Sequence, residues 1–109
     1  AIESGIKMID TSSNYMDGGA ERAIALAFRE FDESVIEDIE VVSKFGYIQN
    51  SNLARHKETP FEEVVEYSEE CYHSISQSFL QDQLSHSLDR LQLPYIDCYL
   101  IHNPEYYLL

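Results

Sequence analysis

The sequence predicts an α/β fold in which parallel strands alternate with helices. Short apolar runs at residues 5–10, 39–46 and 95–101 have the character of strands, and two amphipathic helical patterns separate them. Because parallel neighbours need a crossover connection, the order strand, helix, strand, helix, strand indicates right-handed βαβ units. At 109 residues the chain has the size of one small domain, or part of one. We therefore expect about three strands of a single parallel sheet.

The first half of the chain contains two of these strands. "GIKMID" at 5–10 is mostly apolar and ends at a polar cluster, as is typical of a buried parallel strand. "IEVVSKFG" at 39–46 is rich in β-branched residues and predicts the second strand. Between them, after Gly18-Gly19, apolar residues at helical spacing predict one buried helix face, formed by Ala20, Ala23, Ile24, Ala27, Phe28 and Phe31.

The segment from Gly46 to about Ser78 is irregular. Its roughly 30 residues far exceed the usual 2 to 6 of a strand-to-helix connection. "TPFE" at 59–62 combines a capping box with proline at the first helical position, which predicts a short helix over about 60–68. The acidic residues of 62–70 would then form the solvated face of that helix.

A longer helix and a third strand follow this segment. "SFLQ" at 78–81 repeats the capping signal, and the helix should stop before Pro94. "YIDCYLI" at 95–101 predicts the strand. The leucines expected on the buried face of the helix are Leu80, Leu84, Leu88 and Leu91.

Composition restricts the partners. Twenty acidic against seven basic residues give a net charge of -13, which repels nucleic-acid backbones and anionic membrane surfaces. No apolar run approaches the roughly 20 residues of a membrane span, and the start of the chain does not resemble a signal peptide. We expect a soluble, cytoplasmic protein, although the sequence carries no address that separates cytoplasm from organelle.

The remaining cysteines, histidines and aromatic residues have simpler interpretations. Cys71 and Cys98 are too few for a disulfide framework. No metal site is expected, because no paired ligand spacing occurs among His56, Cys71, His73 and His86. Two interpretations stay open for three aromatic residues, which could belong to the core or to a substrate lid: Tyr67, Tyr72 and Phe79.

Polar residues stand at the carboxyl ends of all three predicted strands. Asp10, Lys44 and His102 hold these positions, and Tyr15 lies in the loop after the first strand. Active sites of parallel α/β folds are built at this end, because strands hold side chains rigidly while the loops vary. We therefore expect these four side chains to converge.

Together the four residues could donate a proton to a carbonyl oxygen. A phenol, with an ordinary pKa of about 10, is a weak acid at neutral pH, but an adjacent ammonium group stabilises the phenolate. Tyr15 would be the acid, Lys44 its activator, and Asp10 the ion-pair partner that holds Lys44. His102 would orient the substrate oxygen. No side chain supplies a hydride, so a nicotinamide cofactor is the natural source.

These motifs resemble the aldo-keto reductase superfamily. "GIKMIDTSSNY" with "AERAIALAF" is similar to the signature around its aspartate and tyrosine, "VVSKFG" to the strand of its lysine, and "SLDRLQLPYIDCYLIHNPE" to the helix and strand before its histidine. The interval from Lys44 to His102 is about 25 residues longer than in compact members, and the excess lies in the segment 46–78. Asn103 stands where many members carry tryptophan.

The resemblance implies an NADPH-dependent enzyme, with NADH possible, that reduces aldehydes and ketones or oxidises alcohols, all small-molecule substrates, on a (β/α)₈ TIM barrel. It implies a catalytic tetrad of Asp10, Tyr15, Lys44 and His102, with Asp10 also near the nicotinamide ribose. A barrel has eight strands in about 250 residues. Residues 1–109 would thus be the N-terminal part of the domain, contributing the second to fourth strands, and would be inactive alone.

Two alternatives remain from the sequence. The protein could be a regulatory subunit that keeps the cofactor pocket and binds a partner, as channel-associated members of the superfamily do. It could also be a truncated, catalytically silent product. The sequence does not specify the substrate or the oligomeric state.

Overall fold

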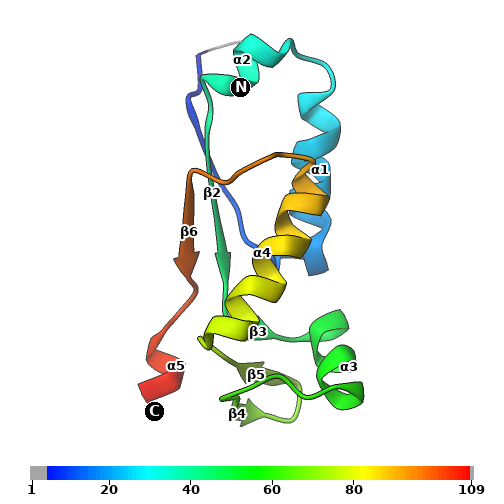
Figure 1. The fold of residues 1–109 in the computed structure, drawn as a ribbon, viewed down its shortest axis with the longest axis vertical. Helices are drawn as coiled ribbons and strands as arrows, with labels where there is room; N and C mark the ends of the chain where they lie inside the picture. The colour runs from blue at the N-terminus through cyan, green and yellow to red at the C-terminus, as the bar shows by residue number, and fades with distance from the viewer. Residues whose placement is uncertain (1–4, 109) are drawn as a thin grey trace.

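A parallel three-stranded sheet forms the centre of the structure. The computed structural model describes residues 5–108, and its side chains as far as Tyr106. The strands β1 (Met8–Asp10), β2 (Glu40–Phe45) and β6 (Cys98–Ile101) are hydrogen-bonded in the order β1-β2-β6. Both pairings are parallel, so all three carboxyl ends lie at the same edge, the lower one in Figure 1. The predicted parallel α/β sheet is confirmed.

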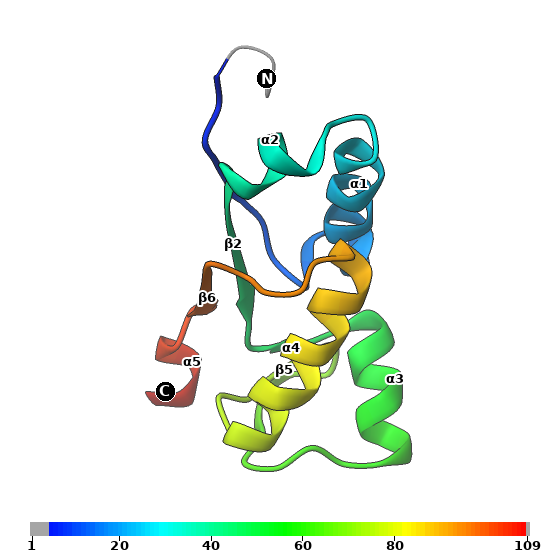
Figure 2. The same cartoon turned by 45° about the horizontal axis from the view of Figure 1, so that its top comes forward.

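Helices cover one face of this sheet. The helices α1 (Gly19–Phe28) and α4 (Gln77–Leu91) lie on the same side of β2, while the short α2 (Glu33–Glu37) is at the opposite end from the strand carboxyl ends (Figures 1 and 2). Phe28, Ile39, Val41 and Leu91 form the buried core between helices and sheet. None of the helices in residues 5–108 is long and apolar enough to cross a membrane.

The irregular segment folds into a unit of its own. It comprises β3 (Tyr47–Ile48), α3 (Asn50–Glu58), β4 (Val65–Ser68) and β5 (Cys71–His73). The three strands make an antiparallel sheet in the order β3-β5-β4, which lies beyond the carboxyl end of β2 (Figure 1). We call residues 46–76 the insert. A second buried core packs the insert against the ends of β2 and α4, and its residues are Phe45, Ile48, Leu53 and Phe79.

The helix predicted over about 60–68 is wrong. Thr59 is instead the extended residue that ends α3, because the following Pro60 disfavours helical backbone in the residue before it. Glu63 then has a left-handed backbone with φ of 50°, and β4 pairs with β5 through Val65, Glu66 and Ser68. The acidic run is exposed as predicted, but it borders a hairpin rather than a helix face.

The predicted helix faces were partly wrong as well. In α1, Ala23 and Ala27 are exposed, whereas Glu21 is fully buried. In α4, which begins two residues earlier than predicted because Ser76 rather than Ser78 caps it, Gln83 and Ser87 are buried and the leucines before Leu91 are only half-buried. The reason is a polar cluster that sequence periodicity cannot reveal. Glu21 accepts hydrogen bonds from Ser43 at 2.7 Å, Ser87 at 3.1 Å and Arg90 at 2.8 Å.

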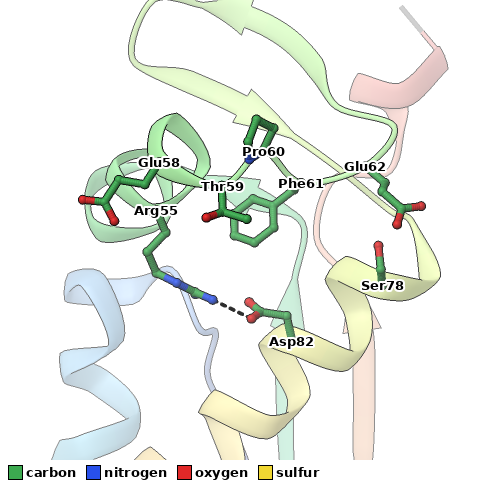
Figure 3. Close-up of a pocket in the computed structure, with 8 residues that line it drawn as sticks. All are labelled: Arg55, Glu58, Thr59, Pro60, Phe61, Glu62, Ser78 and Asp82. Atoms are coloured by element: carbon green, nitrogen blue, oxygen red, sulfur yellow. Dashed lines mark hydrogen bonds and ion pairs between the residues drawn. The ribbon is translucent and has the colours of Figure 1, made fainter.

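Polar contacts also attach α3 to α4. Asn52 and Gln83 exchange hydrogen bonds of 3.0 and 3.2 Å, which accounts for the burial of Gln83. Arg55 pairs with Asp82 beside a cavity of about 390 Å³ lined by both helices and by Phe61 (Figure 3). The Asn52–Gln83 hydrogen bonds and the Arg55–Asp82 ion pair thus fix α3 of the insert to α4.

Candidate active site

The site begins with an ion pair across the two neighbouring strands β1 and β2. Asp10 ends β1 opposite Val42, so Lys44 lies two residues further along β2 and can reach back to it. The Lys44 ammonium donates hydrogen bonds to the Asp10 carboxylate and, at 2.6 Å, to the Thr11 carbonyl. The Lys44 side chain is 13% exposed and that of Asp10 is 64% exposed. Lys44 is thus held inside, while Asp10 keeps an open carboxylate surface.

Tyr15 is brought to this pair by a short, tightly bonded loop. The backbone N–H and the hydroxyl of Ser13 both donate to the carbonyl of Lys44, at 3.0 and 2.8 Å. The 3₁₀ turn Tyr15–Gly18 follows. This path puts the ammonium nitrogen of Lys44 5.3 Å from the centroid of the Tyr15 ring. Tyr15 is 42% exposed, so its ring is partly open to solvent.

His102 closes the site from the third strand. It follows β6 directly, and its backbone N–H donates to the carbonyl of Phe45 at 2.7 Å. Its imidazole meets the Tyr15 ring edge to face, with centroids 5.8 Å apart. Burial, followed by the positive charge of Lys44, lowers the pKa of His102 below its ordinary value. His102 is therefore neutral at neutral pH.

All four residues singled out from the sequence come together. Asp10 contacts Lys44, Lys44 lies over Tyr15, and Tyr15 meets His102. They arrive from three different strands and one loop, at the edge where the strands end. This geometry brings a cation, a phenol and a neutral imidazole within reach of one small molecule.

Sequence reasoning missed His73, which supports His102 from behind. His73 is fully buried in β5, and its Nε2 lies 2.6 Å from the carbonyl oxygen of His102, to which it must donate. Burial lowers the pKa of His73. Gly46 permits this approach, because a Cβ there would lie 2.6 Å from the His73 ring. The sequence offered no signal, since the contact depends on the pairing of β3 with β5.

Aromatic residues of the insert and of α5 (Glu105–Leu108) line one side of the site. The Tyr47 ring packs edge to face on His102, with centroids 4.8 Å apart, and its hydroxyl donates to Asn103 at 2.7 Å. The Tyr106 ring packs edge to face against Tyr47 and Tyr67, with ring centroids 5.6 and 4.7 Å apart. Burial raises the pKa of Tyr47, which keeps its hydroxyl protonated. We call Tyr47, Tyr67 and Tyr106 the aromatic wall.

Two of the three aromatic residues that could belong to the core or to a substrate lid belong to the core. Phe79 is fully buried in the core, and Tyr72 packs half-buried against the same cluster. Tyr67 is mostly exposed at the outer end of the wall. Within residues 5–108, no group of three or more histidine, cysteine or carboxylate side chains is arranged to hold a metal ion.

Comparison with known proteins agrees with this architecture. The model of the Aldo/keto reductase family matches residues 1–108. Among solved structures, an aldo-keto reductase from Bacillus halodurans, determined in its holo form, superposes with a TM-score of 0.66 at 27% sequence identity. The alignment covers 93% of this chain and 28% of that structure, so the chain spans less than a third of its relative. The fold is that of part of a (β/α)₈ barrel, and the chain belongs to the aldo-keto reductase family.

Proposed function

We propose that the full-length protein is an oxidoreductase that reduces small aldehydes or ketones, or oxidises the corresponding alcohols, with NADPH as the hydride source and NADH as the alternative. The observation that carries this proposal is the convergence of Asp10, Tyr15, Lys44 and His102 at the carboxyl ends of three parallel strands. Each side chain has a role that carbonyl reduction requires, and the family assignment supports the same chemistry.

Tyr15 is the proposed general acid. Its side chain is partly exposed, and the Lys44 ammonium lies near its ring and would stabilise the phenolate left after proton transfer. Asp10 and the Thr11 carbonyl hold Lys44 in this position, so the charge is present before the substrate arrives. The developing alkoxide would receive its proton from the Tyr15 hydroxyl.

His102 is the proposed orienting donor. A neutral imidazole beside Tyr15 can donate one hydrogen bond to the same substrate oxygen. Two donors that converge on one oxygen fix the plane of the carbonyl group and polarise it. The same contacts would accept the alcohol in the reverse reaction.

The residues present suit a nicotinamide nucleotide. When bound, this cofactor supplies the hydride that no side chain can provide. One oxygen of the Asp10 carboxylate accepts a hydrogen bond from Lys44, and the side chain is 64% exposed. The carboxylate can therefore accept a further hydrogen bond from a ribose hydroxyl. We assign Asp10 both roles, as the partner of Lys44 and as a ribose contact.

We further propose that residues 1–109 are the N-terminal part of an aldo-keto reductase domain and supply its second to fourth strands. The 28% coverage of the related structure supports the partial domain in this proposal. The segment 46–78 would be an addition at the mouth of the barrel. Because this segment contributes Tyr47, which packs on His102, and Tyr67 to the aromatic wall, we infer that it tunes the choice of substrate.

Steady-state kinetics of the full-length protein on a panel of carbonyl substrates test the proposal. Tyr15→Phe should lower kcat by at least about 100-fold, the scale of lost general acid catalysis, with little change in NADPH affinity. Tyr95→Phe is the matched control, because Tyr95 is an exposed tyrosine that precedes β6 at the opposite end of the sheet. It should retain wild-type turnover.

Lys44→Met supplies the second arm of the test. This variant should also lose the chemical step, since the phenolate of Tyr15 would lack its stabilising charge. Wild-type turnover by either Tyr15→Phe or Lys44→Met would remove that residue from the mechanism. NADPH binding by the wild-type protein without turnover of any substrate would favour the regulatory subunit instead.

A further inference from the structure

Ser12 makes a buried contact with the imidazole of His102. Its hydroxyl oxygen lies 3.1 Å from Nδ1 of His102, and its residue is fully buried in the loop after β1. The same oxygen accepts a hydrogen bond from the backbone N–H of Asn14 at 3.2 Å. The two contacts link the loop that carries Tyr15 to the residue that follows β6.

The hydroxyl hydrogen of Ser12 fixes the direction of this bond. A backbone N–H can only donate, so the bond with Asn14 uses a lone pair of Ser12 and leaves its hydroxyl hydrogen free to donate. Within residues 5–108, Nδ1 of His102 is the single other partner of that hydroxyl. If Nδ1 carried the proton, the hydroxyl hydrogen of a fully buried residue would have no acceptor, which is unfavourable.

We propose that Ser12 is a positioning residue that donates to Nδ1 of His102 and thereby holds this imidazole in the Nε2–H tautomer. A neutral imidazole can carry its proton on either nitrogen, so a hydrogen-bond partner must select one tautomer. Ser12 settles the choice through a bond that lies on the far side of the ring from Nε2.

The catalytic consequence rests on the proposed function. In the Nε2–H tautomer, His102 presents a donor on the nitrogen that has no protein partner in residues 5–108. In the other tautomer, Nε2 would present a lone pair to the lone pairs of the carbonyl oxygen and repel it. Nε2 of a neutral histidine can be either a hydrogen-bond donor or an acceptor, and the bond from Ser12 makes it a donor.

Imidazole ¹⁵N NMR of the full-length protein at neutral pH tests the tautomer directly, with the His102 signals assigned by their loss in His102→Asn. We expect a pyridine-like Nδ1 and a pyrrole-like Nε2 in the wild-type protein. Ser12→Ala should move both signals toward an average of the two tautomers, and Ser12→Thr, which keeps a hydroxyl, should restore them. Ser13→Ala is the matched control, because it removes a neighbouring buried hydroxyl that donates to the backbone carbonyl of Lys44 and not to His102. It should leave the His102 signals unchanged.

Kinetics provide the second readout. Ser12→Ala should lower kcat roughly 3- to 10-fold, the scale of one hydrogen bond, with NADPH affinity unchanged, and Ser12→Thr should recover most of the loss. A pyrrole-like Nδ1 in the wild-type protein would overturn the proposal without any variant, as would an unchanged tautomer in Ser12→Ala. Absence of carbonyl turnover in the wild-type protein would count against the proposed function alone, since the NMR result would still decide the role of Ser12.

Discussion

The two sheets of the molecule serve the same site in different ways. The parallel sheet contributes three of the four candidate side chains, Asp10, Lys44 and His102, from the ends of its strands or just beyond them. The insert contributes none of the four, but His73 binds the backbone of His102 and Tyr47 packs on its ring. One region thus presents the candidate catalytic groups, and the other holds His102 in place and lines one side of the candidate site.

The two regions also differ in how they hold buried polar groups. Behind the parallel sheet, Glu21 and Arg90 form an ion pair surrounded by hydroxyl groups, so the buried charge is fully partnered. In the insert, one of the buried polar side chains is the neutral His73, whose Nδ1 has no hydrogen-bond partner in residues 5–108. We therefore expect the removal of the Glu21 charge to destabilise the parallel sheet and its helices. Protonation of His73 should destabilise the insert.

Breaking the Glu21 cluster should have the largest effect on stability. Glu21→Leu would leave the mostly buried Arg90 guanidinium without its partner, and removal of one member of a buried pair costs about 3–5 kcal/mol. We expect a loss of this size in the free energy of unfolding of the full-length protein, measured by urea denaturation. The activity of the folded fraction should change little, because Glu21 does not touch the site.

Two further variants sharpen this prediction. Adding Arg90→Met to Glu21→Leu should recover a large part of the loss, since it removes the unpaired charge. Glu30→Gln, an exposed glutamate that follows α1, should stay within about 0.5 kcal/mol of the wild type. A Glu21→Leu protein as stable as the wild type would show that the cluster does not hold α1 and α4 to the sheet.

A smaller effect is expected at the outer end of the aromatic wall. Tyr67 is exposed and contacts Tyr106, so Tyr67→Ala should widen the approach to His102 without disturbing the four candidate residues. We expect relative kcat/KM values among carbonyl substrates to shift by up to about 10-fold, the scale of a modest change in an apolar pocket, while NADPH affinity stays the same. An equal change for every substrate would argue that Tyr67 supports the fold and does not select substrates.

The sequence was informative where structure depends on local pattern and strand order. The parallel sheet followed from apolar runs and helical spacing, and the convergence of Asp10, Tyr15, Lys44 and His102 followed from their positions at strand ends. Such positions are set by chain direction, because parallel strands bring their carboxyl ends to one edge. The family resemblance added the roles that the spacing alone could not supply.

The insert was not predictable in the same way. The Thr59-Pro60 signal is compatible with a helix start and with a helix end, and only the pairing of β4 with β5 decides between them. Glu21 was missed because its burial depends on Arg90, which lies on another helix 69 residues away in the chain. His73 was missed because the sequence could not show that its partner would be a backbone carbonyl.

The final prediction concerns the loss of stability at low pH that results from protonation of His73 in the insert. Burial lowers the pKa of His73 in the folded protein, while in the unfolded chain it stays at its ordinary value of about 6.5. The unfolded state therefore binds a proton first as pH falls, so the stability that depends on neutral His73 is complete above about pH 6.5 and is lost below it. His102 shifts in the same direction and adds to this loss. Between about pH 7.5 and about pH 5.5, where ordinary carboxylates stay ionised, His73→Gln should lose less unfolding free energy than the wild type, because glutamine keeps a donor and does not titrate.

The comparison is made by urea denaturation of the full-length protein, with His86→Gln as the control, since His86 is an exposed histidine beside Asp82. An equal acid loss in His73→Gln and the wild type would show that the insert is not the acid-sensitive region.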